Sequence, residues 1–316
     1  MRVITARVGA ALAASTVAIG IAVVPAAAAT ANSPLVTYSF KKLDNAKDRS
    51  FNQLLGINNH NKIVGYFGSG AHGHPNKGYQ LSRPFGHAIY HAENFPGSAQ
   101  TQVAGLNDNA VTVGLFSRTN KSSLLNSFAG FYQQNGKFHR VVFPTGNNSN
   151  PSFNELLGIN NTGLAVGDFA DSLGNMHGFL LNINTHRFTR INIKNSPNVT
   201  ATGINAGGTV VGFFSNASGK IVGFLHRSSG QVVTFSKAGA DMTQAFGINK
   251  GGLVVGAYTI GNNTFGFTWS PGQGFRKVND PNGNGSTVIT GVNSAGDLVG
   301  FYTDSRGITN GMLAVP

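Results

Sequence analysis

Carboxylates are scarce among the side chains that could carry out chemistry in this chain. There are two glutamates, Glu93 and Glu155, and nine aspartates, most of them in segments that read as turns. Glycosidases generally need a pair of carboxyl groups, so few pairings are available for that chemistry. Asp168 stands out because it directly follows a Val-Gly pair, where the matching positions elsewhere in the chain are mostly apolar. It is either a carboxylate that faces a channel and serves a site or a strand-end aspartate in water, and we favour the second interpretation.

Histidines gather near the start of the chain, where His72 and His74 lie in a glycine-rich segment. A His-x-His pair on an extended segment can bind a transition metal. Gly70, Gly73 and Pro75 surround the pair, which predicts a mobile loop, and we therefore expect no metal site. The segment is also longer than its counterparts later in the chain, and inserted loops often carry function. We keep both histidines as ligand-binding candidates.

No familiar catalytic motif is present. The sequence has no Gly-x-Ser-x-Gly elbow, no His-Glu-x-x-His helix, no phosphate-binding loop and no EF-hand spacing. It has no cysteine, which excludes thiol nucleophiles, thiolate metal ligands and disulfides. Trp269, the only tryptophan, is a candidate for stacking on a ligand, although filling the space between sheets is the interpretation that we favour. We assign no catalytic residue and expect no cofactor.

Six copies of one repeat account for most of the chain, and this repeat predicts the fold. Each copy contains a glycine, an aliphatic residue and an asparagine, with glycine starts 49, 53, 45, 44 and 44 residues apart. The three residues begin at Gly56, Gly105, Gly158, Gly203, Gly247 and Gly291. A second column follows at Gly65, Gly114, Gly167, Gly212, Gly256 and Gly300, each after a valine. A third lies at Gly78, Gly130, Gly178, Gly223, Gly266 and Gly311, each before an aromatic residue except in the last copy, which has Met312.

Each copy reads as four short strands separated by turns, which is typical of a propeller blade. The asparagine opens a turn whose later position favours glycine or asparagine, because a positive φ is needed there. Ala110 fits this position worst, so we expect a distorted turn in the second copy. An aromatic residue lies two positions after every second-column glycine, and we expect it to pack between blades rather than to bind sugars.

The two ends of the chain complement each other. Tyr38–Leu43 resembles the fourth strand of a repeat, whereas the last copy stops after its third strand at Pro316. We therefore predict an all-β, six-bladed β-propeller whose last blade is closed by the N-terminal strand, with Phe40–Leu43 beside Gly311–Val315. An open β-solenoid would not need this offset. Residues 30–316 are predicted to form this single domain.

The first 29 residues have the features of a secretory signal peptide. Arg2 and Arg7 precede the apolar run Val8–Val24, and Pro25 is followed by four alanines. A membrane anchor is the alternative, but the run closes early for a spanning helix. We predict a secreted, extracellular protein without stable membrane insertion.

The charge of the mature chain is strongly positive. Without Arg2 and Arg7, 21 of the 23 basic residues remain against 11 acidic residues, a net charge near +10. Such a surface attracts acidic polysaccharides or wall polymers. The basic residues are scattered singly, so we expect no nucleic-acid groove. A chain of this kind is predicted to be a monomer.

The repeat resembles the HAF family of probable extracellular repeats, whose unit reads Gly-Ile-Asn, turn, Val-Val-Gly and Gly-Phe-Leu. The resemblance covers residues 36–316 and is weakest in the turn of the second copy and at Met312. It implies export and a repeat architecture, and it supplies no catalytic residues.

Regular repeats without a catalytic set favour a non-enzymatic extracellular binding or scaffold protein, with an acidic glycan or a cell-wall polymer as its ligand. The alternative is a propeller hydrolase or lyase with its site on one face, built from Asp168 and the first-copy histidines. A purely structural assembly protein is a third hypothesis.

Overall fold

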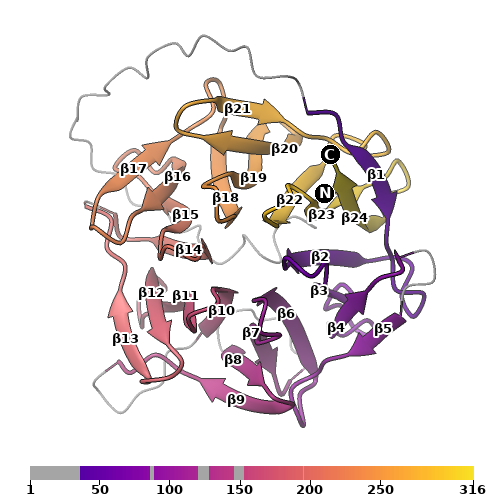
Figure 1. Ribbon diagram of the computed structural model, residues 1–316, viewed down its shortest axis with the longest axis horizontal. Helices are drawn as coiled ribbons and strands as arrows, with labels where there is room; N and C mark the ends of the chain where they lie inside the picture. Colours follow the sequence, from indigo (N-terminus) through magenta and orange to yellow (C-terminus); the bar gives the residue numbers. More distant parts are fainter. Residues whose placement is uncertain (1–35, 86–88, 120–127, 146–152, 195) are drawn as a thin grey trace.

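The computed structural model of the chain describes residues 36–85, 89–119, 128–145, 153–194 and 196–316. All regular elements in these ranges are β-strands, β1 to β24, which form a ring of sheets around a central axis (Figure 1). The predicted signal peptide lies outside the described residues. No helix in the described part of the chain is long and apolar enough to cross a membrane.

The strands fall into four concentric sets. The strands nearest the axis are β2 (Asn52–Ile57), β6 (Gln100–Leu106), β10 (Phe153–Ile159), β14 (Val199–Ile204), β18 (Met242–Ile248) and β22 (Thr287–Val292). The next are β3 (Ile63–Phe67), β7 (Thr112–Ser117), β11 (Leu164–Ala170), β15 (Val210–Ser215), β19 (Val254–Ile260) and β23 (Leu298–Thr303). The third set is β4 (Lys77–Ser82), β8 (Phe128–Gln134), β12 (Met176–Asn182), β16 (Ile221–His226), β20 (Asn263–Ser270) and β24 (Thr309–Val315). The outermost are β5 (Ile89–Ala92), β9 (Lys137–Val141), β13 (Arg187–Arg190), β17 (Val232–Phe235), β21 (Gly274–Lys277) and β1 (Ser39–Lys42).

The division into sheets corrects the predicted blade count. Four sheets have four strands each, and the remaining eight strands, β6 to β13, form one continuous sheet. The prediction of six separate blades is therefore wrong. The second and third repeats merge because β8 and β10 meet in a parallel pair at Phe128 and Phe153. Single parallel bridges of the same kind, Phe51 to Thr309 and Thr264 to Ser286, link other neighbouring sheets.

The predicted closing strand is confirmed. β1 pairs antiparallel with β24, with Ser39 opposite Val315 and Lys42 opposite Met312 (Figure 1). The backbone N–H of Leu43 donates to the carbonyl of Gly311 at 2.9 Å. The first strand of the chain thus covers the edge that the last strand would otherwise expose.

A closed ring of glycines explains the first repeat column. A Cβ atom added to Gly203 would lie 3.1 Å from the Cα of Gly247, and one added to Gly291 would lie 3.2 Å from the Cα of Gly56. Every glycine of this column meets the column glycine of the next repeat in the same way. The innermost strands approach so closely that a side chain at these positions would force them apart.

The asparagine column ties each turn to its neighbour. The Asn160 Oδ1 accepts bonds from the backbone N–H groups of Thr162 and Leu164, both 3.0 Å long. Its Nδ2 donates to the carbonyl of Asn205 at 3.0 Å, in the next repeat. The same donation runs from Asn58 to Asn107, Asn107 to Asn160, Asn205 to Asn249 and Asn249 to Asn293. One asparagine side chain therefore accepts hydrogen bonds from the N–H groups of its own turn and also links two repeats.

The expected distortion at Ala110 is absent. Ala110 adopts a φ of 60°, close to the 57° of Asn61 and the 81° of Gly163 at matching positions. The Asn107 N–H also donates to the carbonyl of Val111 at 3.0 Å, as in the other turns. The turn keeps its shape, and the alanine bears a left-handed conformation that L residues avoid.

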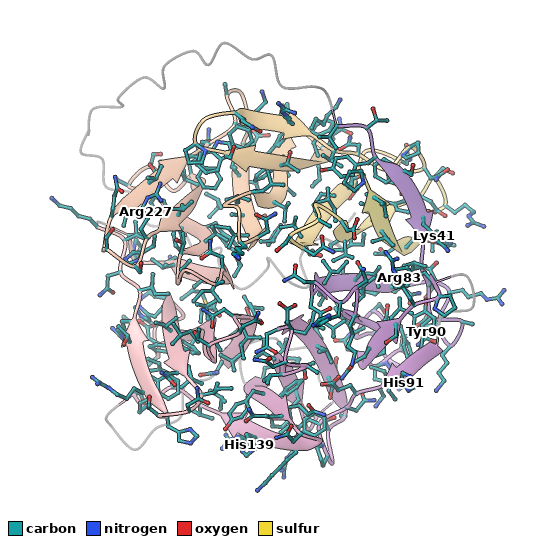
Figure 2. The ribbon with its side chains drawn as sticks, viewed as in Figure 1. Lys41, Arg83, Tyr90, His91, His139 and Arg227 are labelled. Atoms are coloured by element: carbon teal, nitrogen blue, oxygen red, sulfur yellow. The ribbon has the colours of Figure 1, made fainter. Side chains whose placement is uncertain are left out.

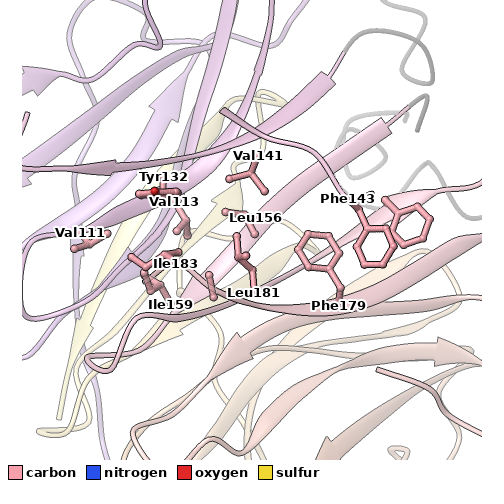
Figure 3. Close-up of a cluster of buried hydrophobic side chains, with 12 residues drawn as sticks. Val111, Val113, Tyr132, Val141, Phe143, Leu156, Ile159, Phe179, Leu181 and Ile183 are labelled. Carbon is pink, nitrogen blue, oxygen red and sulfur yellow. The ribbon is translucent and has the colours of Figure 1, made fainter. Parts of the chain in front are cut away.

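The core consists of clusters between neighbouring repeats. Figure 3 shows one of them, in which side chains of the second repeat, such as Val113 and Val141, pack against Leu156 and Phe179 of the third. The repeated aromatic residue belongs to such clusters in most copies, as in the case of Phe169, which is 1% exposed. The expectation that this ring packs between repeats is confirmed.

Candidate functional site

Asp168 lies on β11 directly opposite Glu155 on β10, at the end of both strands from which the connection to β12 leaves. Asp168 is 1% exposed and Glu155 is 9% exposed. The interpretation of Asp168 as a solvated strand-end aspartate is therefore wrong. Strand pairing places two carboxyl side chains, 13 residues apart in sequence, on one face of the same hairpin.

This pair occurs in only one of the described repeats. The matching residues of the innermost strands are Gln53, Gln102, Thr200, Gln244 and Val288, each paired with a second-strand residue as Glu155 is with Asp168. Those second-strand partners are Tyr66, Leu115, Phe213, Ala257 and Phe301. In the first repeat, for example, the Tyr66 hydroxyl donates to Gln53 Oε1 at 2.8 Å. Both members of the pair are acidic in the third repeat alone.

Burial dominates the electrostatics of the pair. Among the described residues, neither carboxylate oxygen of Asp168 has a hydrogen-bond partner of ordinary geometry. Burial raises the pKa of Asp168 well above its usual range, the Glu155 carboxyl raises this pKa further, and the Thr200 hydroxyl lowers it. Two adjacent carboxylates cannot both ionise easily in a region of low dielectric constant. We therefore expect the pair to hold one proton at neutral pH.

A small pocket on the axis of the ring adjoins Glu155. Its lining residues are Leu55, Ala104, Glu155, Leu157, Thr200, Thr202, Phe213, Phe246 and Thr290, which come from all six innermost strands and from β15. Its volume of about 30 Å³ has room for one or two water molecules. The hydroxyls of Thr202 and Thr290 donate to backbone carbonyls, at 2.9 Å to Ala245 and 2.8 Å to Leu54. The other polar lining residues are Glu155 and Thr200, which come from the neighbouring innermost strands β10 and β14.

The two histidine candidates lie elsewhere, in the loop between β3 and β4. Both are exposed, and His74 Nδ1 lies 3.0 Å from Asp48 Oδ2, whose residue belongs to the loop that precedes β2. His72 makes no contact of this kind among the described residues. The structure therefore does not bring either histidine to Asp168. No group of three His, Asp or Glu side chains in the described part of the chain is arranged to hold a metal ion.

Trp269 packs in the interior, on β20. It is 7% exposed and stacks on Phe235 with ring centroids 3.9 Å apart and planes 13° apart. Phe235 belongs to β17 of the preceding sheet, so the indole joins two sheets. The favoured interpretation of Trp269 as a filler between sheets is confirmed.

Glu93 is a second buried carboxyl group, 5% exposed, but its environment differs from that of Asp168. The Thr112 hydroxyl and the Gln80 amide both donate to it. Burial raises the pKa of Glu93, and these two bonds lower it. Because the carboxylate oxygens of Glu93 already accept these two bonds, which join the first two repeats, we do not include Glu93 in the site.

Sequence reasoning missed Glu155 as the partner of Asp168 and missed Thr200 as the third polar group. The signal was present in the repeat. Asp168 follows the second-column glycine, and Glu155 precedes the first-column glycine by three residues. An antiparallel hairpin with these columns aligned places the two residues opposite each other.

No family model matches the chain. No curated protein sequence matches it either. Solved structures are similar to it at low sequence identity. A gluconolactonase from Xanthomonas campestris is 12% identical with a TM-score of 0.52, over 88% of this chain and 90% of the other. A luciferin-regenerating enzyme is 10% identical with a TM-score of 0.51, over 89% and 96%. The β-propeller domain of the trilobed protease from Pyrococcus furiosus, which has an open velcro topology, is 7% identical with a TM-score of 0.50, over 83% and 95%. At these identities the likeness shows the fold alone, and that fold is a β-propeller.

Proposed function

We propose that the chain is a propeller hydrolase that cleaves a small ester or lactone, with Glu155 and Asp168 as its acid–base pair. The observation that carries this proposal is the buried carboxyl pair beside the axial pocket, found in one repeat and replaced by neutral residues in the others. Perturbed carboxyl groups next to a pocket are typical of catalytic sites.

The facing positions of the two carboxyl groups on one hairpin favour acyl transfer over glycoside hydrolysis. Glycosidases hold their carboxyl groups about 5–9.5 Å apart, with the sugar between them. Asp168 and Glu155 instead lie opposite each other on paired strands and influence each other directly. A pair that shares one proton suits the activation of water against a carbonyl carbon.

Glu155 and Asp168 account for the proton transfers that the hydrolysis requires. Glu155 lines the pocket, which is large enough for the attacking water but not for the ester, so the ester would have to lie at the opening of the pocket. As the ionised member, Glu155 accepts a proton from this water as the water oxygen bonds to the ester carbonyl carbon. Asp168, fully buried behind Glu155, holds the shared proton and is a positioning residue. The Thr200 hydroxyl also lines the pocket and, through its interaction with Asp168, helps to position the pair. Collapse of the intermediate breaks the carbon–oxygen bond of the ester, and the leaving alkoxide takes the proton back from Glu155.

The test is a pH-stat assay of a panel of small lactones, alkyl esters and aryl esters. We expect measurable hydrolysis by the purified protein and a loss of at least about 100-fold in kcat for Glu155→Gln, which is the range for losing a general base. Asp168→Asn should shift the pH profile as well as lower kcat, since it removes the shared proton. Asp304→Asn is the matched control, because this carboxylate lies in an outer loop and pairs with Arg306. Absence of hydrolysis across the panel, or full activity in Glu155→Gln, would refute the proposal.

A non-enzymatic binding module is the second candidate function. The observation that favours it is that the outermost strands β1, β9, β13 and β21 carry eight lysines and arginines and no acidic residue. These strands are separate from the axial pocket.

A further inference from the structure

The outermost strands, which we call the outer wall, carry positive charge only. The outer wall consists of β1, β5, β9, β13, β17 and β21, each at the edge of its sheet. Its basic residues are Lys41, Lys42, Lys137, Arg140, Arg187, Arg190, Arg276 and Lys277, together with His91 and His139. None of these six strands contains an aspartate or a glutamate. Figure 2 shows Lys41, His91 and His139 at the perimeter of the ring.

The acidic residues lie outside these strands, although Asp44, two residues after the end of β1, pairs with Lys42 at 2.9 Å. Glu155 and Asp168 are buried at the axis, and the other acidic residues lie in loops and turns between strands. Charged residues on edge strands prevent sheets from pairing between molecules; lysine is the commonest choice, but glutamate serves that purpose too. Edge protection therefore accounts for the presence of charge on the outer wall and not for its single sign.

Strand geometry presents these charges to the solvent. The second residue of most outer strands is an aromatic residue that packs inward, as Phe138 and Phe188 do. The residues on either side then point outward, because side chains alternate along a strand. On β9, Arg140 lies three residues from Lys137, about 10 Å along the strand, and is exposed as well although alternation puts it on the opposite face. Arg187 and Arg190 repeat this spacing on β13.

We propose that the outer wall binds an extended polysaccharide that bears carboxylate groups. Each contact would be an exposed ion pair, which contributes about 0.2–1 kcal/mol and is screened by salt. Single contacts of this strength do not hold a small anion. A long polymer that follows the wall from β9 to β13 can make several such contacts at once.

The shape of the wall favours a flexible polyanion over a DNA duplex. The basic residues follow the curved circumference of the ring (Figures 1 and 2). Duplex DNA is stiff, with a persistence length of about 150 base pairs, and would touch such a wall along a tangent only. A polysaccharide chain bends more easily and can remain in contact with successive strands.

The experiment measures binding of the purified protein to polygalacturonate across a salt series. The test variant is Lys137→Gln/Arg140→Gln/Arg187→Gln, which leaves Arg190 in place because its guanidinium lies 5.1 Å from the Phe169 ring. The control is Lys47→Gln/Arg49→Gln/Lys250→Gln, which removes three exposed basic residues from turns. We expect the test variant to bind about tenfold more weakly with a shallower salt dependence, and the control to stay within about twofold of the wild type.

Equal losses in the two variants would overturn the proposal, because binding would then follow net charge alone. Equal binding of neutral dextran would overturn it as well, and so would tighter binding of duplex DNA than of polygalacturonate. Ester hydrolysis is measured on the same variants. Because the axial pocket is separate from the outer wall, loss of polymer binding with full hydrolysis supports this inference without bearing on the proposed reaction.

Discussion

Replacing Asp168 with asparagine should change how the stability of the protein depends on pH. An unfolded aspartate has a pKa of 3.8, and burial raises the pKa of Asp168 well above this value in the folded chain. Between these two pKa values the folded protein binds more protons than the unfolded chain. Its free energy of unfolding therefore falls as pH rises through this window, by up to about 1.4 kcal/mol per pH unit, and then levels off. Asp168→Asn removes this dependence while it preserves the shape of the side chain.

Urea denaturation of both proteins between pH 2 and pH 9 tests this expectation. The variant should become progressively more stable than the wild type as pH rises above about 4, while its kcat for hydrolysis falls. Asp171→Asn provides a control of opposite sign. Partial burial raises the pKa of Asp171, but the hydrogen bond from His177 and the backbone N–H groups of its turn lower it to about 2. The wild type therefore gains stability over this control above pH 3.8 and loses the gain as pH falls towards 2.

Two results would refute the reasoning about the carboxyl pair. One is a pair of parallel stability curves for the wild type and Asp168→Asn across the whole pH range. The other is a variant that is less stable than the wild type at pH 8, because that would mean that the ionised carboxylate has favourable partners in the folded state.

Three further predictions concern the repeat itself. Gly203→Ala should lower the free energy of unfolding by about 1–3 kcal/mol, because the added Cβ would lie 3.1 Å from the Cα of Gly247 in the next repeat. Gly207→Ala is the control, because its Cβ would make only an ordinary contact, 3.4 Å from Asn205 Oδ1, and thermal denaturation distinguishes the two variants. Asn160→Ala should cost about 1 kcal/mol more than Asn216→Ala in urea denaturation, because both residues cap a turn but only Asn160 also donates to the next repeat. Ala110→Gly should raise the unfolding free energy by about 1 kcal/mol in the same assay, since its φ of 60° costs an alanine more than a glycine; a loss of stability would contradict this.

The repeat columns made most of the fold predictable from the sequence. Glycine at Gly203 and asparagine at Asn160 recur because the inner strands touch there and because the turns are tied to their neighbours. The surplus strand before residue 43 predicted the pairing of β1 with β24. The merging of two repeats was not predictable, because it depends on a single bridge between Phe128 and Phe153. Such a bridge follows from how closely two sheets approach, and no residue pattern encodes that distance.

The candidate site was only half predictable for a related reason. Asp168 was a candidate because the matching residues of the other repeats are mostly apolar. One such exception does not show whether the side chain is solvated or packed against another side chain. Glu155 looked ordinary, since polar residues such as Gln53 and Gln102 fill most of its column. Only the hairpin register shows that the two exceptions coincide. Glu155 and Asp168 are both exceptions in their columns, and they face each other in the same repeat. The fold does not require acidic residues there, because the other repeats have neutral residues at both positions. The cost of burying two carboxyl groups together therefore has to be offset by something other than stability, and water activation at the axis is the function that their position supports.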